Sequence, residues 1–123
     1  MAIRNVLLID DDLNIRTVAQ IALEDVAGWN VIAVDSGAEA LRTLTEVQPD
    51  LILLDMMMPG MDGKTTLAQI QSEGYTNIPV IFMTAKVQHD ELEQYKALGA
   101  KGVITKPFDP MKLADEIERT LKT

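Results

Sequence analysis

Short runs of consecutive apolar residues recur along the chain, and turn-forming or acidic residues bound each run. Runs of this kind predict strands that are buried on both faces, which is typical of parallel sheets. The predicted strands cover residues 6–9, 31–34, 50–54, 79–83 and 102–105. The first and third of these runs lead directly into aspartates, so two predicted strands end at a carboxylate.

Between the strands, apolar residues recur at the three- to four-residue spacing of an amphipathic helix. The predicted helices cover residues 13–26, 37–47, 63–71 and 90–98, and a last helix begins near residue 110. Asp12 is expected to cap the first helix and Ser36, with Glu39 as its capping-box partner, the second. Asp109 and Pro110 are expected to open the last helix. Its buried face is predicted to carry Met111, Leu113, Ala114, Ile117 and Leu121.

Strands that alternate with helices require crossover connections, and these produce a parallel sheet with helices on both faces. The predicted fold is therefore α/β, a three-layer (βα)5 domain with a five-stranded parallel sheet. Periodicity alone leaves the strand order open. We expect the flavodoxin-like order 2-1-3-4-5, which is one of two common solutions. The chain has 123 residues, so we expect residues 1–123 to form a single domain with no output domain.

The composition narrows the classes of function. Hydrophobic residues make up 47% of the chain but aromatic residues only 4%, so the core must be largely aliphatic. Cysteine is absent, which excludes disulfides and thiolate metal sites. The net charge of −8 disfavours direct binding to nucleic acid, because phosphate binding requires a basic face. No run approaches the ~18 apolar residues of a membrane span, and we expect a cytoplasmic protein.

Chemically useful side chains follow four of the five predicted strands. Asp10 and Asp11 follow the first strand, Asp55 the third, Thr84 the fourth and Lys106 the fifth. The carboxyl ends of parallel strands lie at one edge of the sheet, where ligands bind in this fold class. Each residue alone is more simply explained as a helix cap, a loop residue or a surface lysine. Their joint occurrence at four strand ends favours a functional site.

Three carboxylates in one place repel one another, and a hard cation with oxygen ligands, Mg²⁺, relieves that repulsion. Thr84 offers a hydroxyl donor, and Lys106 offers a compact positive charge suited to phosphate. The site is therefore suited to an anion built on a carboxylate. We expect Asp55 to act as a nucleophile toward phosphorus and to form an aspartyl phosphate, while Lys106 and Thr84 stabilise the transferred oxygens.

Over essentially its whole length the sequence resembles the receiver domain of bacterial two-component response regulators, in particular a single-domain, chemotaxis-type receiver. The motifs that carry the resemblance are Asp10-Asp11, residues 53–63 around Asp55, Thr84-Ala85 and Lys106-Pro107-Phe108. The resemblance implies that a sensor histidine kinase or a histidine phosphotransfer protein phosphorylates Asp55. The domain then changes conformation and controls a downstream protein target.

The resemblance also implies a set of metal ligands. Asp11, Asp55 and the main-chain carbonyl of Met57 would bind Mg²⁺ directly, and Asp10 would act through water. Such a domain catalyses its own phosphorylation and dephosphorylation without turning over an external substrate, so it is not expected to be an enzyme in the usual sense.

The phosphoryl group would be bound by Thr84, by Lys106 and by the backbone amides of Met57 and Ala85. The peptide bond between Lys106 and Pro107 is expected to be cis. One position departs from the family pattern, because receivers usually carry an aromatic switch residue where this chain has Val103. Because of this departure, the sequence leaves open how a movement of Thr84 would be transmitted through the domain.

Two other functional classes fit the sequence less well. A Mg²⁺-dependent phosphatase with an Asp nucleophile would carry a second Asp two residues further on, where this chain has Met57. A flavin- or nucleotide-binding module would carry a phosphate-binding loop after the first strand, where Asp10, Asp11 and Asp12 repel phosphate. The kinase, the downstream target and the existence of a phosphorylation-dependent homodimer are left open.

Overall fold

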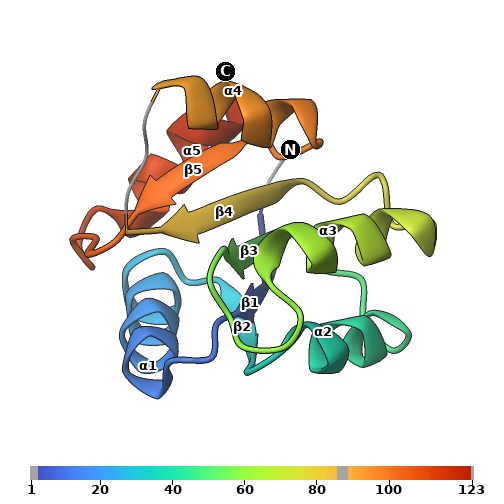
Figure 1. Cartoon of the computed structure of the whole chain (residues 1–123). Coiled ribbons are helices and arrows are strands. Elements are labelled where there is room, and N and C mark those ends of the chain that lie inside the picture. Colours follow the sequence, from blue (N-terminus) through green and yellow to red (C-terminus); the bar gives the residue numbers. More distant parts are fainter. Residues whose placement is uncertain (1–2, 86–88, 123) are drawn as a thin grey trace.

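A computed structural model describes residues 3–85 and 89–122 of the chain. Strands and helices alternate along it (Figure 1). In chain order they are β1 (Asn5–Ile9), α1 (Leu13–Ile21), the π-helix η1 (Ala22–Val26), β2 (Asn30–Val34), α2 (Gly37–Leu44), β3 (Leu51–Asp55), α3 (Gly63–Ser72), β4 (Val80–Thr84), α4 (His89–Ala97), β5 (Gly102–Thr105) and α5 (Leu113–Lys122). In the described part of the chain, no helix is long and apolar enough to cross a bilayer.

The strands form one parallel sheet in the order β2-β1-β3-β4-β5, which confirms the predicted fold class and strand order. Within it Ile9 pairs with Leu54, Asp55 with Met83, and Thr84 with Thr105. The carboxyl ends of β1, β3, β4 and β5 are therefore level with one another. This register brings the residues that follow these strands to a single edge of the sheet.

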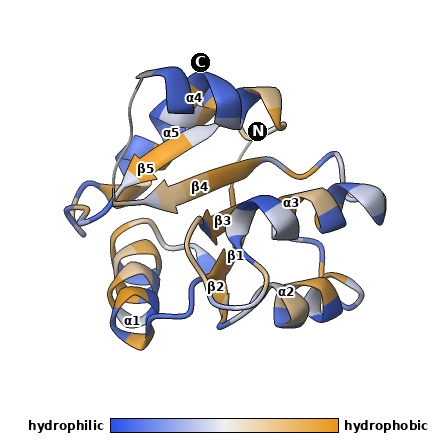
Figure 2. Cartoon of the chain, viewed as in Figure 1, coloured by the Kyte–Doolittle hydropathy of each residue, from blue (hydrophilic) through white to orange (hydrophobic). Residues whose placement is uncertain are grey.

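Two apolar cores lie on opposite faces of the sheet, because successive side chains of a strand point in opposite directions. On one face, residues such as Leu8, Leu53 and Met83 pack with α1, η1 and α5. On the other face, residues such as Ile9 and Phe82 pack with α2, α3 and α4. Figure 2 shows hydrophobic colouring along the strands and hydrophilic colouring on much of the helices. Burial on both faces explains the continuous apolar runs of the inner strands β1, β3 and β4, whereas the edge strands β2 and β5 are only partly buried.

The predicted caps of the first two helices are present. The Asp12 side chain accepts hydrogen bonds from the amides of Asn14 and Ile15, and the Ser36 side chain accepts one from the Glu39 amide. The second helix ends at Leu44 rather than at residue 47, and the segment predicted as the end of the first helix winds as a π-helix. Periodicity therefore located these elements well but placed their ends less accurately.

The last helix begins at Leu113, three residues later than the sequence suggested. The preceding residues form a turn in which Asp109 accepts a hydrogen bond from the Met111 amide at 2.9 Å. The expectation that Met111 shares the buried face of the helix is wrong, because its residue is 69% exposed. Helical periodicity does not apply to a residue that lies in a turn before the helix. Leu113, Ala114 and Ile117 are buried as expected.

Gly63 sets how closely α3 approaches the end of β3. A Cβ atom at this position would lie 2.6 Å from the Asp55 carbonyl oxygen and 2.8 Å from the Met56 Cα. The Gly63 amide donates to the Met56 carbonyl at 3.0 Å. Because both close contacts are with backbone, a larger residue would have to move the strand end that carries Asp55.

We therefore predict that Gly63→Ala lowers the free energy of unfolding by about 1–3 kcal/mol, as overpacking against backbone does. Urea denaturation followed by circular dichroism measures the change. Gln69→Ala on the exposed face of the same helix is the control and should stay within about 0.5 kcal/mol of the original chain. Equal stability of the two variants would contradict the close packing at Gly63.

Candidate functional site

Three carboxylates meet at the carboxyl edge of the sheet. One oxygen atom from each of Asp10, Asp11 and Asp55 lies within 4.8 Å of the others. The Nζ atom of Lys106, just beyond β5, lies 2.7 Å from Asp10 Oδ2 and 3.0 Å from Asp55 Oδ1. The structure thus brings Lys106 into direct contact with Asp10 and Asp55 and places Asp11 beside these carboxylates. Thr84, the last residue of β4, is buried at the same edge.

Asp10 is fully buried, and its polar groups are paired. Its Oδ1 atom accepts from the Asp12 amide at 2.9 Å, and its Oδ2 atom accepts from Lys106. Its main-chain amide donates to the Val34 carbonyl at 3.1 Å, and its carbonyl accepts from Arg16 Nη1 at 2.7 Å. Sequence reasoning missed Arg16 as a neighbour of the site, although its position four residues after Asp12 on a predicted helix was a detectable signal.

Asp55 is the last residue of β3 and is only 5% exposed. Its Oδ1 atom accepts from the Met57 amide at 3.2 Å as well as from Lys106. Burial raises the pKa of Asp55 and the charge of Asp10 adds to the rise, while the hydrogen bonds from Lys106 and Met57 and the charge of Lys106 oppose it, and the resulting pKa is about 6. A partly desolvated carboxylate of this kind is more basic than a carboxylate in water and is still ionised at neutral pH.

Lys106 carries the positive charge of the site. Burial alone would lower its pKa, but hydrogen bonds to Asp10 and Asp55 and the charges of these carboxylates outweigh burial and raise the pKa. The peptide bond between Lys106 and Pro107 is cis. Lys106 therefore stays positively charged, and its ammonium could also bind a further anion beside Asp55.

The other predicted site residues differ in exposure and position. Asp11 and Ala85 are exposed, and the Met57 residue is 76% exposed while its amide faces Asp55. Val103 is half-buried, packs against the second core and lies opposite Phe82 in the sheet register. The described contacts do not place the Met57 carbonyl or the Ala85 amide against any ligand, so these two roles stay predictions.

The donor set fits a hard divalent cation. Three carboxylates supply only oxygen atoms, which Mg²⁺ prefers over nitrogen or sulfur ligands. Asp10 already uses both oxygens for hydrogen bonds, whereas among the described residues no hydrogen bond engages the Asp11 carboxylate. Asp11 and Asp55 are thus better suited than Asp10 to direct coordination.

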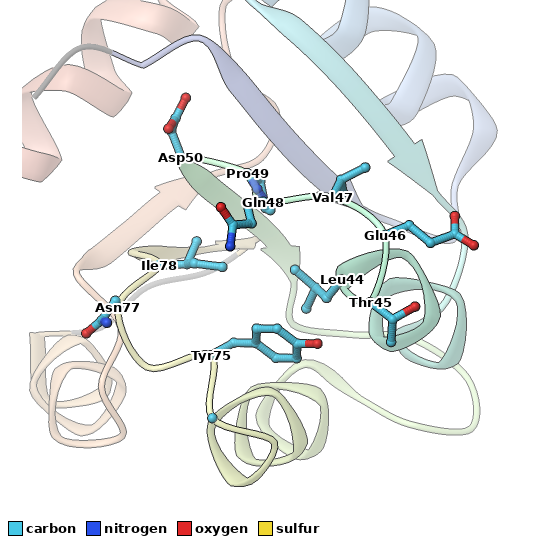
Figure 3. A pocket seen from close by; sticks show the side chains of 11 residues that line it. Leu44, Thr45, Glu46, Val47, Gln48, Pro49, Asp50, Tyr75, Asn77 and Ile78 are labelled. Atoms are coloured by element: carbon cyan, nitrogen blue, oxygen red, sulfur yellow. The ribbon is translucent and has the colours of Figure 1, made fainter.

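A larger cavity lies at the opposite edge of the sheet, and it holds none of these residues (Figure 3). Its volume is about 830 Å³, and the loops before β3 and β4 supply most of its lining. Tyr75 and Leu44 point toward one another inside it. Its Asp50 carboxylate already accepts from the amides of Arg4 and Asn5, both at 2.9 Å. The cavity offers no cluster of reactive groups, so the carboxylate cluster is the better candidate for chemistry.

Comparison with known proteins gives a consistent result. A family model described as the response regulator receiver domain matches residues 6–118. The phosphate regulon transcriptional regulatory protein PhoB of Pseudomonas aeruginosa is 34% identical over 120 residues, which are 97% of this chain and 52% of that protein. The probable C4-dicarboxylate response regulator DctR of Priestia megaterium is 38% identical over 115 residues, 93% of this chain and 50% of that protein. The chain thus spans about half the length of these curated relatives.

Solved structures agree with the sequence comparison. The chemotaxis protein CheY4 of Vibrio cholerae superposes with a TM-score of 0.87 at 32% identity, covering 98% of this chain and 100% of that one. The signal receiver domain of a histidine kinase from Syntrophus aciditrophicus superposes with a TM-score of 0.79 at 30% identity, covering 97% and 90% of the two chains.

The raised pKa of Asp55 predicts a pH dependence of stability in the metal-free protein. The folded-state pKa of about 6 lies above the ordinary value of 3.8, so the folded chain binds the proton more tightly than the unfolded chain. Stability from this group is therefore gained as the pH falls through about 6 toward 4 and is lost as the pH rises. We expect Asp55→Asn to raise the melting temperature, relative to the original chain, more at about pH 7 than at about pH 5.

Differential scanning calorimetry in the presence of a chelator measures this difference. Asp62→Asn is the control, because a hydrogen bond from the Thr65 amide lowers the pKa of Asp62. The stability that the ionised Asp62 side chain contributes is lost only as the pH falls below the ordinary pKa of 3.8. A difference in melting temperature between Asp55→Asn and the original chain that is the same at both pH values would rule out the raised pKa of Asp55.

Proposed function

The chain belongs to the response regulator receiver domain family, and from this premise we propose that it is a phosphorylation-controlled switch with Asp55 as the phosphoacceptor. The observation that supports this most directly is the buried Asp55 carboxylate, which shares the Lys106 ammonium with Asp10. A receiver acts on a phosphoryl group carried by a partner. The donor in our proposal is the phosphohistidine of a sensor kinase or of a phosphotransfer protein.

The transfer step follows from the contacts of Asp55. Its Oδ1 atom already accepts from Lys106 and from the Met57 amide, so we assign the attack to Oδ2. The Oδ2 atom forms a bond to phosphorus while the phosphorus–nitrogen bond of the donor breaks. The electron pair of the broken bond stays on the imidazole nitrogen. Lys106 then lies beside the new phosphoryl oxygens, and Thr84 and the Met57 and Ala85 amides complete their binding.

In this proposal Asp11, Asp55 and the Met57 carbonyl hold Mg²⁺, and Asp10 acts through water. The two hydrogen bonds on the Asp10 carboxylate support the indirect role. The bound ion supplies positive charge that offsets the carboxylates and the incoming phosphoryl group. Lys106 alone cannot do this, because one ammonium faces three carboxylates.

We propose that the output is contact with a protein target in the cytoplasm. The net charge of −8 supports this over direct binding to nucleic acid. The phosphoryl group is attached to the chain and later lost to water, so the protein is a switch rather than an enzyme with an external product. That the domain acts as a stand-alone receiver is also a proposal, and the size of the native polypeptide in its source cells tests it.

The switch must use a device other than an aromatic ring at position 103. Val103 lies opposite Phe82 in the register of β4 and β5, and the Phe82 ring contacts Tyr95 of α4 at a centroid distance of 5.4 Å. Phe82 lies two residues before Thr84 on β4. We propose that movement of Thr84 reaches α4 through this packing, with a free-energy difference of only a few kcal/mol between states.

We predict that Asp55→Asn abolishes phosphorylation by acetyl phosphate with Mg²⁺, because an amide oxygen is too weak a nucleophile. Intact mass spectrometry measures the gain of one phosphoryl group. Asp50→Asn is a matched control at the opposite end of the same strand region and should be phosphorylated like the original chain. Undiminished labelling of Asp55→Asn would refute the assigned phosphoacceptor.

We also predict that Asp11→Ala weakens Mg²⁺ binding by about ten-fold or more, because it removes a carboxylate that no hydrogen bond engages within the described part of the chain. The metal-free melting temperature should stay the same or rise slightly, since one of three like charges is lost. Isothermal titration calorimetry and thermal unfolding measure the two quantities. Asp35→Ala, at an exposed acidic residue after β2, is the control; equal Mg²⁺ affinity of both variants would exclude Asp11 as a ligand.

A further inference from the structure

Arg16 lies beside the aspartates that follow β1. It is the fourth residue of α1, whose N-terminal cap is Asp12, so it stands four residues after an acidic residue. An acidic and a basic residue at this spacing share one face of a helix and favour it. The main-chain amide of Arg16 donates to the Asp12 carbonyl at 3.0 Å. The backbone therefore places the Arg16 side chain next to the Asp10–Asp12 segment, and the contact of its guanidinium is informative.

That contact is with the backbone of the carboxylate site. Arg16 Nη1 donates to the Asp10 carbonyl at 2.7 Å, across six residues of chain. The register of β1 with β3 ends at Ile9, so the Asp10 carbonyl lies beyond that ladder. Asp10 is fully buried. A buried carbonyl that loses its partner is destabilised by about 1–3 kcal/mol, so Arg16 has a strong reason to stay in place.

The position of Asp11 depends on its two neighbours. Among the described residues no hydrogen bond engages the Asp11 carboxylate, and its side chain is exposed. The backbone around it is held by Asp12, which caps α1, and by Asp10, whose amide binds Val34 and whose carbonyl binds Arg16. The Arg16 contact thus completes the set of bonds that fix the Asp10–Asp12 segment.

We propose that Arg16 is a positioning residue, which holds the Asp10–Asp12 backbone so that the Asp11 carboxylate faces Asp55 and is ready to bind a divalent cation. The inference rests on the proposed function, because it concerns the same metal site. It adds a residue that touches neither the ion nor the phosphoryl group. Arg16 acts through the Asp10 carbonyl alone.

If the charge of Arg16 were all that mattered, its removal would have the opposite effect on Mg²⁺ binding, which makes the proposal easy to test. None of the ion pairs within the described residues includes Arg16, so its charge is not neutralised at short range. The guanidinium lines a cavity of about 320 Å³ with Asp35 and Glu39, and Glu39 pairs with Arg42. Removing a positive charge near a cation site should strengthen Mg²⁺ binding by Coulomb's law. Removing a positioning contact should weaken it.

The test compares Arg16→Met and Arg16→Lys with the original chain. Methionine keeps much of the apolar stem but loses both charge and donor, and we expect Mg²⁺ binding to weaken about ten-fold, as for other residues that orient metal ligands. Lysine keeps a charged donor, and the contact with the Asp10 carbonyl uses one guanidinium nitrogen, so lysine should restore most of the affinity. Arg119→Ala on α5 is the control for loss of one positive charge. Isothermal titration calorimetry measures the dissociation constants.

A second measurement needs no metal. The Asp12 amide donates to Asp10 Oδ1 at 2.9 Å, so its hydrogen exchange reports on the order of this segment. We expect faster exchange at Asp12 in Arg16→Met than in Arg119→Ala, with the Leu53 amide of β3 as a reference for global unfolding. Because this readout is taken without Mg²⁺, it judges the Arg16 contact even if the original chain failed to bind Mg²⁺ and the proposed function fell.

Weaker Mg²⁺ binding in Arg16→Met, together with faster Asp12 exchange and recovery in Arg16→Lys, supports the proposal. Unchanged or stronger Mg²⁺ binding in Arg16→Met overturns it, because charge alone then accounts for the effect of Arg16. Weaker binding with unchanged Asp12 exchange also overturns it, since the loss would not come from the segment that Arg16 is proposed to hold.

Discussion

The site depends on one ammonium group that lies between two buried carboxylates. Lys106 contacts Asp10 and Asp55 at once, and these residues come from the ends of β5, β1 and β3. Without this cation, buried negative charges would face one another in a poorly solvated edge of the sheet, which is strongly unfavourable. With it, the carboxylates can stay close together. The cluster is therefore compatible with a stable fold, although its carboxylates still outnumber its one ammonium group.

That excess of carboxylates gives the site its chemistry. Three carboxylates and one ammonium form a cluster that could hold a divalent cation, and under the proposed function an added phosphoryl group would meet both cations. The groups are mounted on strands whose side chains are buried on both faces, so their positions vary little. The cavity of about 830 Å³ at the other edge of the sheet has no comparable arrangement. Charge and position therefore identify the candidate site here.

Much of the fold could be predicted from local sequence. Continuous apolar runs indicated a sheet buried on both faces, and Asp12 and Ser36 marked helix starts that the structure confirms. The errors have a local cause as well. Met111 follows the spacing of a helix but lies in a turn that Asp109 closes, and periodicity cannot distinguish the two. The roles of Met57, Ala85 and Val103 are still predictions, because no contact of the described residues tests them.

The sequence by itself determined which residues end each strand, because apolar runs and the polar residues that follow them are adjacent in the chain. It also determined the charge and the oxygen-rich chemistry of the candidate site. Only the tertiary structure decided that Lys106 contacts Asp10, 96 residues away in sequence, and that Arg16 binds the Asp10 carbonyl. Those contacts depend on the strand order and on how α1 packs, which are set by burial of long-range apolar surface and not by local pattern.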